Sequence, residues 1–81
     1  MSRLEFHPLL VNTCSADEEG RLIVVDGRLV GVLVQLQADE QATRRGQWNL
    51  EAGFGPLAGY APEPFGDLEE ARRWITRALS D

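Results

Sequence analysis

Two apolar runs joined by Asp26-Gly27 constrain the fold of this chain more than any other feature. Asp-Gly between runs rich in branched side chains predicts a β-hairpin with a type I′ turn, because both central residues of that turn need a positive φ. We therefore expect two antiparallel strands, Arg21–Val25 and Arg28–Gln37.

A two-residue turn also sets the pairing of the strands that it joins. The expected register places Val24 opposite Leu29, Ile23 opposite Val30 and Leu22 opposite Gly31. One face of the hairpin then carries Ile23, Val25, Val30, Val32, Val34 and Leu36. The other face carries Leu22, Val24, Leu29, Gly31 and Leu33, so both faces are apolar near the turn.

Three later segments complete the expected fold. Apolar and polar residues alternate over Gln47–Phe54, which predicts a half-buried strand. Several prolines and glycines interrupt Gly55–Gly66, which predicts a long loop. Asp67 is a good N-cap, and an apolar stripe that includes Trp74 and Ile75 predicts a helix over Asp67–Leu79, packed on the sheet.

The N-terminal segment is less regular. Residues 4–7 alternate in polarity and residues 9–11 are apolar, but Pro8 between them cannot donate to a sheet ladder. We expect Arg3–Val11 to form an irregular strand at a sheet edge. The expected class is a single small α+β domain, residues 1–81, with a three-stranded or four-stranded antiparallel meander and one C-terminal helix on one face.

Charge and composition exclude several function classes. Eight basic against 13 acidic residues give a net charge of −5, which repels phosphate backbones, so we expect no nucleic-acid partner. One histidine, His7, and one cysteine, Cys14, supply too few ligands for a zinc site, and we expect no cofactor. A catalytic pair of these two residues is a minor alternative.

Localisation follows from the same residues. A lone cysteine cannot form an internal disulfide, which favours a reducing compartment. No stretch approaches the ~18 apolar residues of a membrane span, and Glu5, His7 and Pro8 interrupt any N-terminal signal peptide. We expect a cytoplasmic protein without a membrane partner.

The second apolar face of the hairpin is the main functional indication. One helix covers one side of a small sheet, so Leu22, Val24, Leu29, Gly31 and Leu33 need another cover. Either the Gly55–Gly66 loop and Leu9–Val11 fold across them, or another chain does. We favour a non-enzymatic interaction module, a homodimer or accessory subunit. The alternative is a small-molecule or peptide-binding domain, with Trp48, Tyr60 and Phe65 in the gap between the sheet and the Gly55–Gly66 loop.

The hairpin and two later segments resemble compact bacterial strand-strand-strand-helix proteins. These segments are W-N-L-E-A-G-F-G from Trp48 and F-G-D-L-E-E-A-R-R-W-I from Phe65. The resemblance implies this fold and, because it carries no catalytic motif, no activity.

Overall fold

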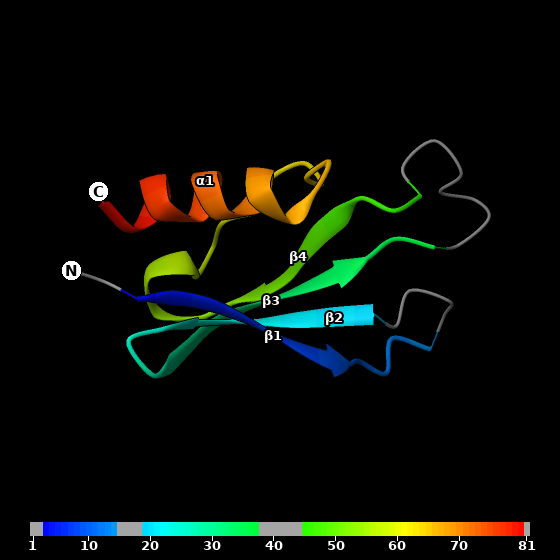
Figure 1. Cartoon of the computed structure of the whole chain (residues 1–81), viewed down its shortest axis with the longest axis horizontal. Helices are drawn as coiled ribbons and strands as arrows, with labels where there is room; N and C mark the ends of the chain where they lie inside the picture. Colours follow the sequence, from blue (N-terminus) through cyan, green and yellow to red (C-terminus); the bar gives the residue numbers. More distant parts are fainter. Residues whose placement is uncertain (1–2, 15–18, 38–44, 81) are drawn as a thin grey trace.

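A computed structural model describes residues 3–14, 19–37 and 45–80 of the chain. Its elements are β1 (Leu4–Leu10), β2 (Glu19–Val25), β3 (Arg28–Gln35), β4 (Trp48–Gly53), the short 3₁₀ helix η2 (Gly55–Leu57) and α1 (Leu68–Ser80). The strands form an antiparallel sheet in the order β1-β2-β3-β4, and α1 lies on one face of it (Figure 1). This α+β meander confirms the predicted class, with the N-terminal segment as its fourth strand.

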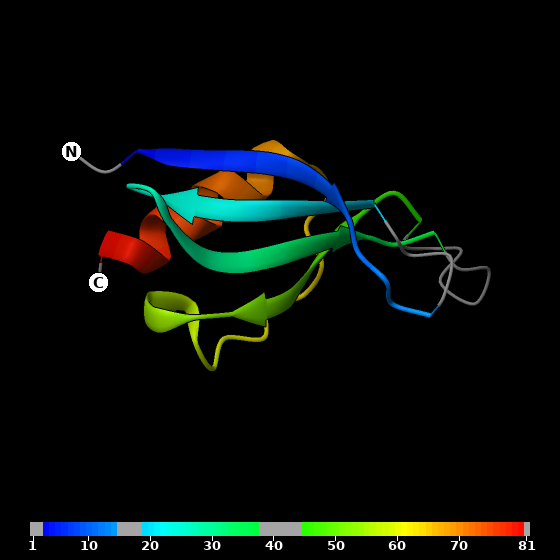
Figure 2. The same ribbon diagram turned by 90° about the horizontal axis from the view of Figure 1, so that it is seen from below.

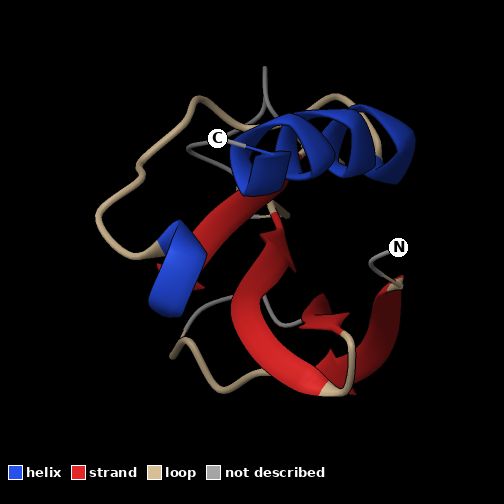
Figure 3. Cartoon of the chain, turned by 90° about the vertical axis from the view of Figure 1, so that its left-hand side faces the viewer, coloured by secondary structure: helices blue, strands red, loops and turns tan. Residues whose placement is uncertain are grey.

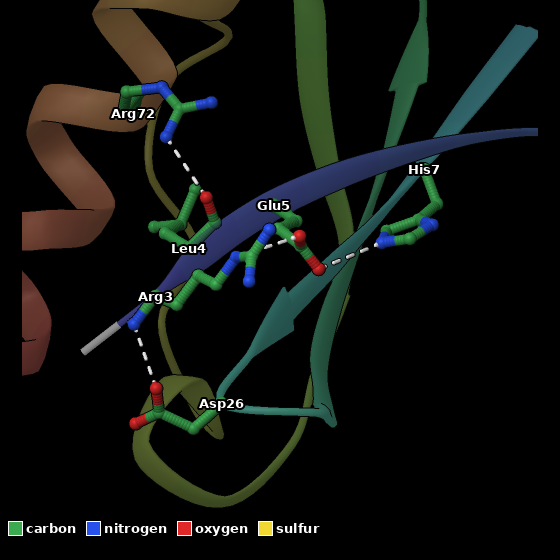
Figure 4. A network of polar contacts seen from close by, with 6 residues as sticks. All are labelled: Arg3, Leu4, Glu5, His7, Asp26 and Arg72. Atoms are coloured by element: carbon green, nitrogen blue, oxygen red, sulfur yellow. Dashed lines mark hydrogen bonds and ion pairs between the residues drawn. The ribbon is translucent and has the colours of Figure 1, made fainter.

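The hairpin turn has the predicted conformation. Asp26 and Gly27 have φ values of 52° and 81°, as a type I′ turn requires. The turn also anchors the start of β1. The backbone N–H of Arg3 donates to Asp26 Oδ1 at 2.7 Å (Figure 4), and the N–H of Asp26 donates to the Arg3 carbonyl at 2.9 Å.

The predicted register is wrong beyond the second pair after the turn. Val24 pairs with Leu29 as expected, but Ile23 pairs with Gly31, because Val30 is an extra residue in a β-bulge. A shift of one residue moves each later side chain to the other face of the sheet. Gly31 and Leu33 therefore lie on the face toward α1. The prediction that they share a face with Leu22, Val24 and Leu29 is wrong.

The core lies between α1 and the face of the sheet that carries Ile23 and Leu33. Figure 3 shows the sheet curving beneath α1. Leu33 and Ile75 are fully buried there, and Trp74 packs against the cluster with part of its ring exposed. The buried members of the cluster are Ile23, Val30, Leu33, Trp48, Leu50, Leu57, Phe65, Ala71 and Ile75. We expected the helix to pack on Val30, Val32, Val34 and Trp48; Val30 and Trp48 do belong to its core cluster, but Leu33 replaces Val32 and Val34 there.

The N-terminus of α1 is capped as the sequence predicts. Asp67 Oδ1 accepts a hydrogen bond from the N–H of Glu70 at 2.8 Å. The Glu70 carboxylate in turn accepts from the N–H of Gly66 at 3.0 Å. These reciprocal bonds satisfy N–H groups that a helix start leaves without partners, so the helix begins at Leu68.

Gly53 allows η2 to approach the end of β4. A Cβ atom at position 53 would overlap the backbone carbonyl of Leu57, which cannot move without shifting η2. We expect Gly53→Ala to lower the free energy of unfolding by about 1–3 kcal/mol, measured by urea denaturation. Gly66→Ala is the control, because its Cβ would meet only Glu70 Oε1, at 3.8 Å. Equal midpoints for the two variants would contradict the close approach.

Candidate interaction surfaces

The sheet face opposite α1 carries an apolar surface that we call the open patch. The register places Leu22 beside Val32, Val32 beside Ala52, and Val24 beside Leu29. Phe54 belongs to the same face, because a Cβ on Gly53 points toward the core residue Leu57 and the extended backbone then turns Phe54 the other way. The open patch consists of Leu22, Val24, Leu29, Val32, Ala52 and Phe54.

Within residues 3–14, 19–37 and 45–80, the chain covers one end of this face. Seen from the side away from α1, the segment that follows β1 crosses the ends of the next two strands (Figure 2). Val11 lies there against Gly20, and the neighbouring Val34 is fully buried. The open patch lies nearer the hairpin turn, where Leu29 and Phe54 remain 44% and 45% exposed.

The proline-containing loop is not the cover. Leu57 and Phe65 belong to the core beneath α1, and the Tyr60 ring packs edge-on against Trp74, with centroids 5.3 Å apart. Phe65 also pairs with Trp48, through backbone hydrogen bonds of 2.8 and 2.7 Å, along the outer edge of β4. The expectation that the loop and Leu9–Val11 fold across this face is therefore wrong for the loop, whereas Val11 does lie against the face, at Gly20.

Polar groups border the open patch on both sides. On β1, Glu5 forms an ion pair with Arg3 at 3.0 Å, and its Oε1 lies within hydrogen-bond distance of His7 Nε2, at 3.3 Å (Figure 4). On β4, Asn49 Nδ2 donates to Glu51 Oε2 at 2.7 Å. An apolar centre with a polar rim is the usual composition of a protein–protein interface.

A second surface lies between α1 and the loop, and we call it the aromatic cleft. Its larger hollow has a volume of about 520 Å³ and is lined by Pro62, Glu63, Pro64, Phe65, Glu70, Arg73, Trp74 and Arg77. An adjoining hollow of about 160 Å³ shares Trp74 and Arg77 and adds Tyr60 and Ala78. Together the two hollows follow the length of α1.

The three residues predicted to form a ligand pocket, Trp48, Tyr60 and Phe65, do not line one common pocket. Trp48 is buried in the core, Phe65 forms part of the larger hollow, and Tyr60 lines the smaller one. The hollows lie between the loop and α1, rather than between the loop and the sheet. Sequence reasoning missed Trp74 as a surface residue because it assigned the whole apolar stripe to the core. The signal that could have shown this is the position of Arg73 and Arg77 on either side of Trp74 in the sequence, because arginines favour the exposed side of a helix.

Among the described residues, no hydrogen bond joins the remaining candidates, His7 and Cys14. The ring of His7 contacts Glu5, whereas the N–H of Cys14 donates to Asn12 Oδ1 at 3.1 Å; both residues are exposed. Within residues 3–14, 19–37 and 45–80, no three His, Cys, Asp or Glu side chains are grouped to hold a metal ion. In the same ranges, no helix has the length and apolarity needed to cross a membrane.

Fold and surfaces together define a small α+β protein with an uncovered apolar sheet face and an aromatic cleft beside its helix. Compared with protein-family models, with curated proteins and with solved structures, the chain matches none of them. Its function is therefore inferred from the two surfaces.

Proposed function

We propose that this protein is a non-enzymatic interaction module that forms a homodimer, with the open patch of one copy against the open patch of the other. The observation that carries the proposal is the exposure of Leu29 and Phe54, near the hairpin turn, on an apolar sheet face that the described segments leave uncovered there. The proposal involves no cofactor and no nucleic acid. The exposed, unpaired Cys14 supports a reducing, cytoplasmic setting.

The distribution of polar groups supports a second copy as the occupant. Two-fold symmetry is the commonest arrangement of homo-oligomers, and sheets pack well face to face with nearly aligned strands. A two-fold axis along the strands places β1 of one copy over β4 of the other. His7, which the register places level with Ala52, then approaches Glu51 of the second copy, so that an imidazole and a carboxylate meet at the rim.

The sheet edges are less suited to self-association than the face. Arg3 directs its backbone toward the hairpin turn, so alternation directs the backbone groups of Leu4, Phe6 and Pro8 outward. Pro8 has no N–H to offer, and the Leu4 carbonyl already accepts from Arg72 Nη1 at 3.1 Å (Figure 4). At the other edge, the backbone N–H and carbonyl of Trp48 are already hydrogen-bonded to Phe65. Addition of a strand from another copy is therefore hindered at both edges.

Sedimentation velocity tests the dimer. We expect a mass near twice 9.0 kDa at high concentration, and dissociation on dilution, because the patch is smaller than the ~20–30 residues that each partner of a standard interface contributes. Leu29→Glu should give a folded monomer, since it places a charge in the contact.

The matched control is Leu10→Glu, which adds the same charge at a residue that is 72% exposed and outside the patch. This variant should dimerise like the unmodified chain. A mass of 9.0 kDa for the unmodified chain at every concentration, or a Leu29→Glu dimer of unchanged affinity, would contradict the proposal.

A further inference from the structure

We propose that the aromatic cleft binds a short, extended acidic peptide, in which an Asp or Glu carboxylate lies next to an apolar residue or proline. This site is separate from the proposed dimer contact. The open patch lies on the face of the sheet away from α1, whereas the cleft lies between α1 and the loop.

Two arginines at the cleft are available to an anionic ligand. Arg73 and Arg77 lie one helical turn apart on α1, both are exposed, and neither forms an ion pair with a described residue. The Glu69–Arg73 pair that helical spacing allows is not formed. Guanidinium groups present several N–H donors in a plane that matches a carboxylate, so two of them favour an acidic ligand.

Two carboxylates, Glu63 and Glu70, share the larger hollow with these arginines, so its formal charge is balanced. The Glu70 carboxylate accepts from the N–H of Gly66 at 3.0 Å, as part of the helix cap. Glu63 is likewise engaged within the protein. The smaller hollow, by contrast, is lined by Arg77 and by no acidic residue, so Arg77 is the cation that an anionic ligand meets there.

The floor of the cleft suits an apolar side chain. Trp74 is only half-buried, and its ring is held by Tyr60 at 5.3 Å and Phe65 at 5.6 Å between centroids. Pro62 and Pro64 complete the apolar lining. Rings and prolines that are already fixed lose little conformational entropy when a ligand packs on them.

The dimensions favour a peptide over a compact molecule. From Glu70 to Ala78 the two hollows extend about 12 Å along α1, at 1.5 Å per residue. An extended chain advances about 3.3 Å per residue, so three or four peptide residues match that length. A small molecule would occupy one hollow and leave the other empty.

An NMR titration with the blocked peptide acetyl-Pro-Glu-Phe-Asp-amide tests the site. We expect saturable shifts of the Trp74 indole N–H and of the backbone around Arg77. The amide analogue acetyl-Pro-Gln-Phe-Asn-amide, of the same shape, should bind at least about tenfold more weakly, because it lacks the charge-assisted hydrogen bonds. The double variant Arg73→Gln/Arg77→Gln should show a similar loss, whereas Arg28→Gln, which removes one exposed charge at the hairpin, should bind normally.

Three results would overturn the proposal: equal affinity for the acidic and amide peptides, unchanged affinity of the double variant, or no shift at millimolar peptide. Phenylacetate provides a further arm, and if it binds as tightly as the peptide, the occupant is a small carboxylate rather than a peptide. The titration is repeated on Leu29→Glu, whose cleft is unaltered, so its outcome does not depend on the dimer.

Discussion

Replacing Leu33 with Glu is expected to unfold the protein. Leu33 is fully buried in the core cluster beside Leu50, and its cross-strand neighbour Arg21 is already paired with Glu19 at 3.2 Å, so a carboxylate here has no free partner. An unpaired buried charge costs about 3–5 kcal/mol in addition to the lost apolar contacts. A chain of 81 residues has a total stability of roughly 4–12 kcal/mol, so most of it is removed. Circular dichroism and urea denaturation measure the loss.

Val32→Glu is the matched control, because it adds the same charge one residue away. Val32 lies in the open patch on the opposite face, where a carboxylate remains hydrated. We expect this variant to fold and to be monomeric. In a regular hairpin without the bulge at Val30, Val32 would face the helix and Leu33 the opposite side. Val32→Glu would then be the less stable of the two variants. A folded Leu33→Glu variant beside an unfolded Val32→Glu variant would therefore show that the strands are paired without the bulge.

Truncation of Ile75 to Ala is expected to lower the free energy of unfolding by about 2–5 kcal/mol. Ile75 is fully buried in the core cluster, so the change removes apolar contacts and leaves a cavity. Thr76→Ala, at the next and exposed position of α1, should change stability by no more than about 0.5 kcal/mol. Urea denaturation of both variants measures the difference. Similar midpoints would mean that α1 does not pack on the sheet through Ile75.

The two proposed surfaces can be tested separately because they lie on different sides of the sheet. A charge at Leu29 changes the open patch without reaching α1, and neutral residues at Arg73 and Arg77 change the cleft without reaching the open patch. Failure of the dimer would leave the peptide site untouched, and failure of peptide binding would leave the dimer untouched. A folded monomer that binds the acidic peptide would assign function to the cleft alone.

Local signals in the sequence were sufficient for the elements and the class of fold. Asp26-Gly27 specifies a turn in which both residues take positive φ, and Asp67 caps a helix that begins at the next residue. The alternation over Gln47–Phe54 predicts a strand with one buried face, which is correct for Trp48 and Leu50; a register shift at Glu51 then moves Ala52 to the other face. Each of these features depends on residues within a few positions of one another, so a single sequence contains the information.

The tertiary structure alone decided which side chains share a surface. Apolar residues occupy both faces of the hairpin, so the pattern did not reveal that Val30 is a bulge residue that exchanges Leu33 for Val32 beneath the helix. Contacts distant in sequence decided the rest. Val11 reaches Gly20 on the far face, and the loop pairs Phe65 with Trp48 instead of covering the open patch. Their free energy comes from burial against partners many residues away, which local periodicity does not encode.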